Sequence, residues 1–220
     1  MTEETAYDVR FQAPMTMQVI GQTGAGKSFW VKRLLENAQQ VIHPAPQKII
    51  YCYGEWQPLF DEMQKIPNLQ FEKELTESLV SRENLKNQRT LLIIDDLADE
   101  VSPKLMTALY TKYSHHRHVS CVLLLQNLFF QGLSSLRNLA VNTHYYVLFR
   151  SPRDHGSIST MGRQMYGPQY KSFVAAYEDA CSEKFGHLIV DSKADTPWQI
   201  RLRTRIFPNE TTVAYVIKRR

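Results

Sequence analysis

One stretch of eight residues constrains the fold of this chain more than any other. It reads Gly21-Gln22-Thr23-Gly24-Ala25-Gly26-Lys27-Ser28 and fits the pattern G-x-x-x-x-G-K-[ST] of a phosphate-binding loop. Glycines at both ends let the backbone curl until successive N–H groups point at phosphate oxygens. The segment 15–20 reads as a short buried strand before the loop, and apolar residues at helical spacing over 29–41 predict a helix after it. The chain is therefore expected to be an α/β protein with a mostly parallel central sheet flanked by helices.

The loop also predicts its ligand. Its backbone, with Phe29 directly after it, would surround the phosphates of a nucleoside triphosphate, so the expected cofactors are ATP and Mg²⁺. Lys27 would reach the β- and γ-phosphates, and the Ser28 hydroxyl would bind the metal. The helix that follows would add the positive end of its dipole. Every residue from Gly21 to Phe29 is thus a candidate for nucleotide binding.

A second apolar run, over 90–94, ends in two acids, Asp95 and Asp96. Such a run is typical of a parallel strand that is buried on both faces, and the carboxyl ends of these strands border the ligand crevice. Asp95 would hold Mg²⁺, directly or through water, and Asp96 would polarise the attacking water. The alternative is that the two acids only end a strand and begin a turn.

A third strand, predicted over 119–125, ends in Gln126. If this strand neighbours the acid-bearing one, the Gln126 amide would lie near the γ-phosphate and could hydrogen-bond both phosphate and the attacking water. Gln is also an ordinary residue at the end of a strand. The proposed role of Gln126 therefore depends on its place in the chain, after the phosphate loop and the acid-bearing strand.

Arginines stand at two places where they could act on phosphate. Arg117 stands just before the 119–125 strand, within the cluster His115-His116-Arg117-His118. The histidines do not favour a metal site, since adjacent positions do not converge on one ion. Arg150 and Arg153 follow a strand predicted over 143–149, where they are either phosphate or subunit contacts or solvated charges of a turn.

The chain reads as one domain without internal repeats. Residues 1–13 are expected to form a flexible lead-in, 14–208 the nucleotide-binding domain, and 209–220 a basic end packed as an edge strand or a tail. Further elements are predicted at 48–53, 69–71, 187–191 and 198–205 as extended segments, and at 57–66, 75–86, 103–114, 133–139, 154–165 and 168–183 as helices.

Composition excludes several other classes of protein. The chain has 220 residues and no run of about 18 apolar residues, so no transmembrane helix is expected. The polar, acidic N-terminus is unlike a signal peptide, and Cys52, Cys121 and Cys181 read as reduced core residues of an intracellular, unsecreted protein. A net charge of +4 is compatible with a polyanionic partner but too small to indicate one.

The order of these segments is more specific than the phosphate loop alone. GQTGAGKS is followed by LLIIDDL, RHVSCVLLLQNLFFQG, NTHYYVLFRSPRD and FGHLIVDSKADTPWQIRLRTRIFP. Over 15–208 the chain closely resembles the DNA-packaging ATPases of the FtsK–HerA superfamily, found in poxviruses, virophages, adintoviruses and Maverick/Polinton elements. The QNLFF and NTHYYVLFRSPRD segments discriminate this family from other phosphate-loop proteins, and the resemblance implies a core like that of RecA.

The resemblance implies a function and partners. A homo-oligomeric ring, hexamer or pentamer, would hydrolyse ATP to drive double-stranded DNA into a preformed capsid, with a capsid or portal protein as partner. The setting would be the host cytoplasm or nucleus, in a virus factory, or the virion. For contact with DNA the candidates are Lys104, Lys112 and Arg137.

The resemblance also implies roles for single residues. Lys27 and Ser28 match the phosphate and Mg²⁺ residues, and Asp95 matches the metal residue. Asp96 occupies the position of the catalytic acid, where many relatives carry Glu, and Gln126 that of a sensor glutamine. An arginine before the sensor strand is thought to reach the γ-phosphate of a neighbouring subunit; Arg117 is the first candidate and Arg153 the second.

Other functions fit parts of the same pattern. A small-molecule kinase shares the phosphate loop but should carry a lid with clustered arginines, and the arginines here are scattered. A nucleotide-binding assembly switch at a capsid vertex would hydrolyse ATP slowly, and Asp96 in place of Glu is compatible with this alternative. A DNA pump of a mobile element or plasmid, without a virion, would look much the same.

Overall fold

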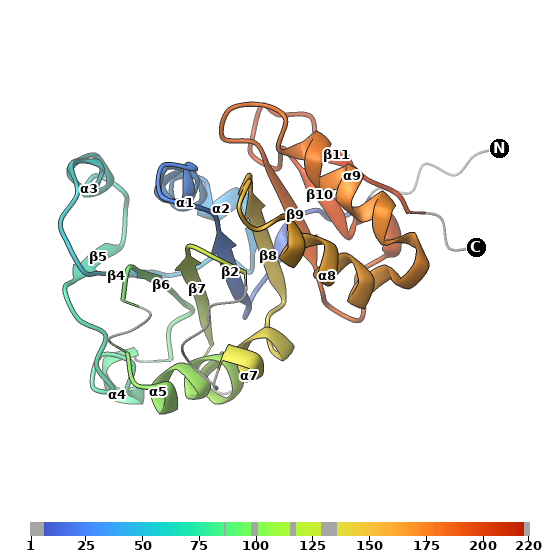
Figure 1. The fold of residues 1–220 in the computed structure, drawn as a ribbon. Helices are drawn as coiled ribbons and strands as arrows, with labels where there is room; N and C mark the ends of the chain where they lie inside the picture. The colour runs from blue at the N-terminus through green and yellow to red at the C-terminus, as the bar shows by residue number, and fades with distance from the viewer. Residues whose placement is uncertain (1–6, 86, 98–100, 115–117, 129–135, 218–220) are drawn as a thin grey trace.

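A computed structural model describes residues 7–85, 87–97, 101–114, 118–128 and 136–217 (Figure 1). Within these residues one sheet has nine strands in the order β11-β10-β9-β8-β2-β7-β6-β4-β5. Its strands are β2 (Thr16–Ile20), β4 (Lys48–Tyr53), β5 (Leu69–Glu72), β6 (Thr90–Asp95), β7 (Val119–Leu125), β8 (Tyr145–Phe149), β9 (His187–Asp191), β10 (Leu202–Thr204) and β11 (Val213–Ala214). A separate short pair joins β1 (Phe11–Gln12) to β3 (Ile42–His43).

Six neighbouring strands of the sheet run parallel to one another: β8, β2, β7, β6, β4 and β5. Beyond β8 the sheet continues with β9, β10 and β11, and each of these pairs antiparallel with its neighbours. This confirms the predicted α/β fold with a mostly parallel central sheet. The central strands β6, β7 and β8 are buried along their whole length, as their apolar runs predict for strands covered on both faces.

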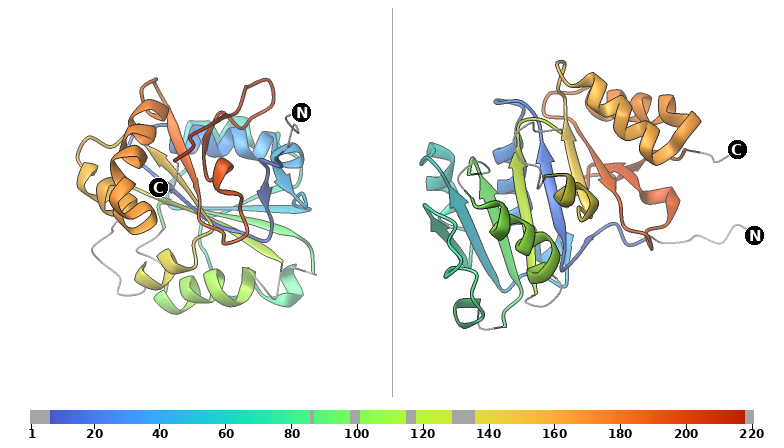
Figure 2. Two further views of the ribbon diagram at one scale, coloured as in Figure 1. Left: turned by 90° about the vertical axis from the view of Figure 1, so that its right-hand side faces the viewer. Right: turned by 60° about the horizontal axis from the view of Figure 1, so that its bottom comes forward.

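Helices cover both faces of the sheet (Figures 1 and 2). One face packs against α1 (Lys27–Glu36), α2 (Ala38–Val41) and α3 (Pro58–Met63). The other packs against α4 (Arg82–Leu85), α5 (Pro103–Ala108), the π-helix η1 (Leu109–Tyr113), α7 (Leu136–Val141), α8 (His155–Tyr166) and α9 (Tyr170–Ala180). Two short 3₁₀ turns are η2 (Gly167–Gln169) and η3 (Trp198–Ile200). The result is three layers with a hydrophobic core on each side of the sheet.

Part of the expected lead-in over 1–13 is packed rather than loose. Phe11 is fully buried and pairs with Ile42 in the β1–β3 ladder. Its ring meets those of Tyr145 and Trp30 at centroid distances of 4.9 and 6.3 Å. A buried aromatic ring of this kind stabilises the attachment of the segment. At the other end of the chain, β11 lies antiparallel to β10 as an edge strand.

The predicted helix over 75–86 is wrong over most of its length, because within 75–85, the part that the structure describes, the helix covers only Arg82–Leu85. The Thr76 hydroxyl accepts a hydrogen bond from the N–H of Leu79, which holds the backbone in a turn that competes with a continuous helix. The Ser81 hydroxyl accepts from the N–H of Asn84 and caps the helix where it begins, at Arg82. The predicted extended segment 198–205 likewise divides into η3 and β10. Among the described helices, none is long and apolar enough to cross a membrane.

Candidate active site

The sheet order brings the sequence motifs to one edge. Strand β2, which precedes the phosphate loop, lies between β8 and β7, and β7 separates it from the acid-bearing β6. Ile20 pairs with Leu125, and the N–H of Gly21 donates to the Leu125 carbonyl at 3.1 Å. The phosphate loop and the ends of β7 and β6 therefore share the carboxyl edge of the parallel strands. The chain continues from β2 to β4 on one side of β2 and from β7 to β8 on the other. This is the position at which open α/β sheets bind ligands.

The loop itself has the shape that its glycines predict. Gly24 and Gly26 have φ angles of 80° and 103°, in the left-handed region that favours glycine. The Lys27 ammonium donates to the carbonyls of Gly21 at 2.5 Å and Gln22 at 3.3 Å, so its charge lies across the loop. Burial lowers the pKa of Lys27, and Asp95, with Asp96, opposes that shift. The cation is thus held in a partly buried position next to two acids.

The side-chain oxygens of Ser28 and Asp95 lie close together beside the phosphate loop. The hydroxyl of Ser28 and Oδ2 of Asp95 lie 3.5 Å apart, and the hydroxyl of Tyr51 on β4 donates to the same Oδ2 at 2.6 Å. Burial raises the pKa of Asp95, while the Tyr51 hydrogen bond and the Lys27 charge act against the rise. Hydroxyl and carboxylate oxygens are the hard ligands that Mg²⁺ prefers, so Ser28 and Asp95 fit it. A bound Mg²⁺ would neutralise charge on the β- and γ-phosphates.

Asp96 and Gln126 reach the same edge but remain exposed to solvent. Asp96 follows β6 with a φ of 59°, a left-handed conformation in which Asp is enriched among residues other than glycine. Gln126 directly follows Leu125, the residue that bonds the start of the phosphate loop. The neighbouring N–H of Leu128 donates to Oδ2 of Asp154 at 3.1 Å, which fixes the turn after β7 to the start of α8.

Of the two candidate arginines, Arg153 can be placed. It is exposed in the turn between β8 and α8, and that turn adjoins the phosphate loop because Gln22 Nε2 donates to the Ser151 hydroxyl at 3.3 Å. Ser151 in turn donates its N–H to the Tyr177 hydroxyl at 2.9 Å, on α9. Arg117 lies outside the described residues, and its role stays a prediction.

The candidate DNA contacts lie away from the loop. Lys104 on α5 and Lys112 on η1 are both exposed, on elements that cover the face opposite α1. The side chain of Arg137 lies outside the described residues. In the described part of the chain, no three His, Cys, Asp or Glu side chains form a group that could hold a metal ion.

The sequence patterns assign no role to three residues near the loop: Tyr51, Ser151 and Phe185. Tyr51 reaches Asp95 only because β4 pairs with β6 in a register that sets Tyr51 beside Ile93, two residues before the acid. Phe185 contacts the loop from the segment between α9 and β9: a Cβ added to Gly26 would lie 2.7 Å from its ring. Phe185 begins the quoted FGHLIVD segment, but nothing in that segment indicates that its ring reaches the phosphate loop.

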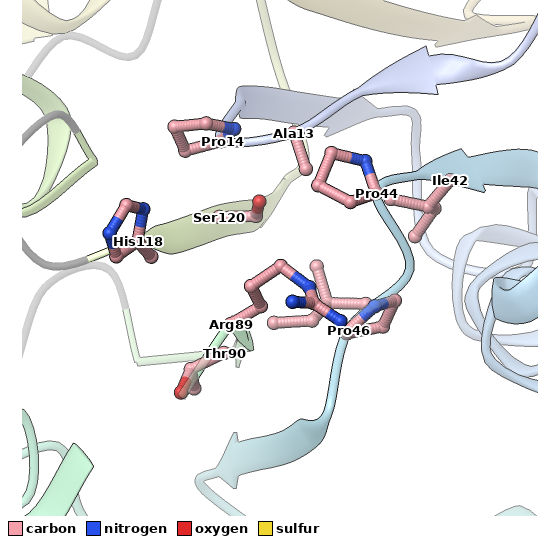
Figure 3. Close-up of a pocket in the computed structure, with 10 residues that line it drawn as sticks. Ala13, Pro14, Ile42, Pro44, Pro46, Arg89, Thr90, His118 and Ser120 are labelled. Atoms are coloured by element: carbon pink, nitrogen blue, oxygen red, sulfur yellow. The ribbon is translucent and has the colours of Figure 1, made fainter. Parts of the chain in front are cut away.

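A separate small pocket lies at the opposite, amino edge of the strands (Figure 3). Pro14, Pro44, Pro46, Arg89 and His118 surround it, beside the first residues of β6 and β7. Its volume of about 30 Å³ admits no more than a water-sized group. This pocket is therefore distinct from the phosphate loop and too small for a nucleotide.

No protein-family model matches the chain, and the curated proteins contain no match. Among solved structures, it is similar to the cytoplasmic domain of the type VII secretion ATPase EccC of Thermomonospora curvata, with 14% identity and a TM-score of 0.49 over 91% of this chain and 25% of that one. It is also similar to the cytoplasmic domain of EssC, with 12% identity and a TM-score of 0.49 over 92% of this chain and 39% of that one. A KaiC-like protein of Pyrococcus horikoshii OT3 gives 12% identity and a TM-score of 0.46 over 93% of this chain and 91% of that one.

The chain spans 25% of EccC and 39% of EssC. At these TM-scores the similarities carry no argument about function, which rests on the chain's own residues.

Proposed function

We propose that this chain is a Mg²⁺-dependent ATPase. The observation that carries the proposal is the convergence of Lys27, Ser28 and Asp95 at the carboxyl edge, with the Ser28 and Asp95 oxygens 3.5 Å apart. Backbone N–H groups of the loop would bind the phosphates, Lys27 would hold the β- and γ-phosphates, and Ser28 with Asp95 would hold the metal. Lys27 and the bound metal would place positive charge where negative charge develops during phosphoryl transfer.

Asp96 and Gln126 would act on the attacking water. Asp96 would accept a proton from the attacking water. At the same time the water oxygen would bond to the γ-phosphorus, and the bond from the γ-phosphorus to the β–γ bridging oxygen would break. Gln126 would orient the same water and contact the γ-phosphate from the end of β7. Both side chains are exposed at the edge where the triphosphate would lie, which supports these roles.

We further propose that hydrolysis drives double-stranded DNA through a homo-oligomeric ring into a capsid. The support is the resemblance of the QNLFF and NTHYYVLFRSPRD segments to packaging ATPases. Exposed Lys104 and Lys112 would grip DNA phosphates without reading bases, so binding would weaken as salt rises. Arg117, or Arg153 in its place, would complete the site of the neighbouring subunit. A capsid or portal protein would hold the ring in place.

The proposal is tested by steady-state ATP hydrolysis with and without linear duplex DNA, at low and moderate salt. We expect duplex DNA to stimulate turnover, the stimulation to fade with salt, and the Lys27→Ala variant to be inactive in every condition. Unchanged turnover of purified Lys27→Ala would contradict the site assignment. A phosphorylated small-molecule product would instead identify a kinase.

One alternative is favoured by a specific residue. Asp96 stands where many packaging relatives carry Glu, and its shorter side chain suits an assembly switch that binds ATP and hydrolyses it slowly. ATP binding without any response to DNA would point to this switch or to a missing capsid partner, and empty capsids added to the assay would separate the two. A DNA pump without a virion would respond to DNA but not to capsids.

A further inference from the structure

A large cleft at the nucleotide edge begins at the phosphate loop. It has a volume of about 740 Å³ and starts at Gly26 and Phe29. From there it runs between α1 and two segments from the end of the chain, 182–187 and 204–215, where Phe185 and Arg205 line it. We propose that this cleft binds the base and ribose of the nucleotide, with the base stacked on the exposed ring of Phe185. This inference rests on the proposed binding of ATP at the loop.

The sheet order gives the direction in which the nucleotide must lie. Lys27, Ser28 and Asp95 act on the β- and γ-phosphates, and Asp95 belongs to β6, which lies beyond β7 on one side of β2. The cleft is lined by Phe149 of β8 and His187 of β9, on the other side of β2. A triphosphate whose γ end faces Asp95 therefore leaves the loop with its nucleoside end toward the cleft.

The cleft offers a surface suited to a flat ring. Phe29 and Phe185 are 48% and 46% exposed, and their ring centroids lie 6.3 Å apart with a tilt of 35°. Large apolar side chains left exposed side by side, next to polar groups, are typical of a binding surface. Every nucleobase has a face that stacks on such a ring.

Contacts on both sides hold Phe185 in this position. Its φ of 63° is uncommon for an aromatic residue, and its ring packs against Gly26 of the phosphate loop. Behind it, the Trp30 indole donates to Nε2 of His187 at 3.0 Å. The Phe185 ring thus contacts the phosphate loop, and the segment that carries it is attached to α1 through His187 of β9.

The far side of the cleft is held by ion pairs. Arg33 of α1 bonds Glu210 at 2.6 Å and lies over the Phe207 ring at 4.3 Å. Arg205 bonds Glu183 at 3.1 Å, which ties the 182–186 segment to the end of β10. The volume of the cleft falls within the range of about 300–1,000 Å³ that is usual for sites of small molecules.

The test compares ATP with inorganic tripolyphosphate, which has the same phosphates and no nucleoside. Binding of each to the purified chain is measured by calorimetry in the presence of Mg²⁺. We expect the wild type to bind ATP more tightly than tripolyphosphate. In Phe185→Ala the affinity for ATP should fall by about tenfold, because a base–aromatic stack is lost, while the affinity for tripolyphosphate stays the same.

Two further variants separate stacking from support of the loop. Phe185→Leu keeps apolar bulk against Gly26 but has no flat ring, so it should lose ATP affinity and retain tripolyphosphate affinity. Trp198→Ala removes an indole that is 47% exposed and lies outside the cleft, and it should change neither.

The outcomes distinguish this inference from the function on which it rests. Equal losses for both ligands in the Phe185 variants, or no loss for ATP, would overturn the base site while leaving phosphate binding intact. Equal affinities for the two ligands in the wild type would overturn it as well. If the wild type binds neither ligand, the proposed nucleotide binding fails and the base site fails with it.

Discussion

The hydroxyl of Tyr51 donates a 2.6 Å hydrogen bond to Oδ2 of Asp95, and both residues are buried. The same carboxylate oxygen lies 3.5 Å from the Ser28 hydroxyl. Tyr51 thus orients the proposed metal carboxylate from the neighbouring strand. Partners that fix a metal ligand in this way contribute strongly to metal affinity.

Removal of that hydroxyl should weaken the binding of Mg²⁺. In Tyr51→Phe we expect the affinity for Mg²⁺ in the presence of ATP to fall by about 10- to 100-fold, with ATP binding in EDTA unchanged. The bond also opposes the raised pKa of Asp95, so the variant should lose Mg²⁺ binding at a higher pH than the wild type as pH falls. Calorimetric titration of Mg²⁺ and paramagnetic resonance of bound Mn²⁺ both measure the effect.

Tyr110→Phe is the matched control for Tyr51→Phe. It removes an equally buried hydroxyl that donates to the Met17 carbonyl at 3.1 Å, in the core of the opposite face. The control should lose stability without losing Mg²⁺ affinity. Equal metal affinities for wild type and Tyr51→Phe would show that the hydroxyl only fills the core.

Mixed subunits test whether an arginine acts between neighbours. Arg117→Ala should retain ATP binding and lose hydrolysis in the assembled state, and Asp96→Asn should also be inactive. Mixing the two should restore part of the turnover, because each subunit supplies the group that the other lacks; an arginine in trans is worth about 10³-fold or more in rate. ATP turnover across mixing ratios is the measurement. If no ratio restores turnover and Arg153→Ala with Asp96→Asn does, the role belongs to Arg153.

Folding stability should depend on pH through His187. Burial lowers the pKa of His187 to about 4, and Nε2 accepts from Trp30 while Nδ1 lies 3.3 Å from the Phe185 carbonyl, so the ring is neutral when folded. The unfolded chain, with a His pKa near 6.5, binds the proton earlier as pH falls. Its contribution to stability is therefore complete above pH 6.5 and is lost as pH falls toward 4, by about 3 kcal/mol over that window.

Urea unfolding between pH 4 and pH 7.5 measures this contribution. His187→Gln keeps a group that can accept from Trp30 and does not titrate, so its stability should vary less with pH than that of the wild type. Parallel curves for the two proteins would contradict a buried neutral histidine.

The buried pair of Arg203 and Asp191 should be sensitive to the loss of one partner. NH1 of Arg203 lies 3.2 Å from Oδ2 of Asp191, and the side chains are 1% and 4% exposed. Asp191→Ala leaves the guanidinium without its counter-charge and should cost about 3–5 kcal/mol of unfolding free energy. The exposed Asp195, on the same connection, gives the control Asp195→Ala, which should change stability little.

A double variant tests the charge explanation. Asp191→Leu with Arg203→Met removes both charges and should recover much of the stability lost in Asp191→Ala, because apolar residues can replace a buried pair. Equal destabilisation of the single and double variants would assign the effect to the bonds of Asp191 with Thr196 and Lys193 instead.

Local patterns predicted the parts of the fold that depend on neighbouring residues. The phosphate loop fixes its strand and helix within one stretch, and the apolar runs of β6, β7 and β8 mark buried parallel strands. The sequence did not predict the order of the strands: the role of Gln126 was stated only for the case that its strand neighbours the acid-bearing strand. That β7 lies between β2 and β6 is a property of pairings between distant segments, which no local periodicity contains.

The residues of the candidate site likewise fall into those that local motifs predicted and those that they did not. Lys27, Ser28 and Asp95 stand in motifs whose spacing reflects their chemistry, and the structure brings them together. Tyr51 and Phe185 were not predicted, because one depends on the register of β4 against β6 and the other on the path of a loop between α9 and β9. The 75–86 segment shows a further limit, since its apolar spacing is helical but the Thr76 hydroxyl bonds the backbone in a turn.

The phosphate loop is bonded to both halves of the sheet. Gly21 donates to Leu125 of β7 on one side, and Gln22 donates to Ser151 in the turn that leads into α8 on the other. Rotation of the α8–α9 hairpin against the parallel strands would consequently deform the loop and lower its affinity for phosphate. By thermodynamic reciprocity, bound phosphate resists that rotation with the same coupling free energy. Binding of phosphate to the loop and rotation of the hairpin against the parallel strands are therefore expected to be coupled equilibria.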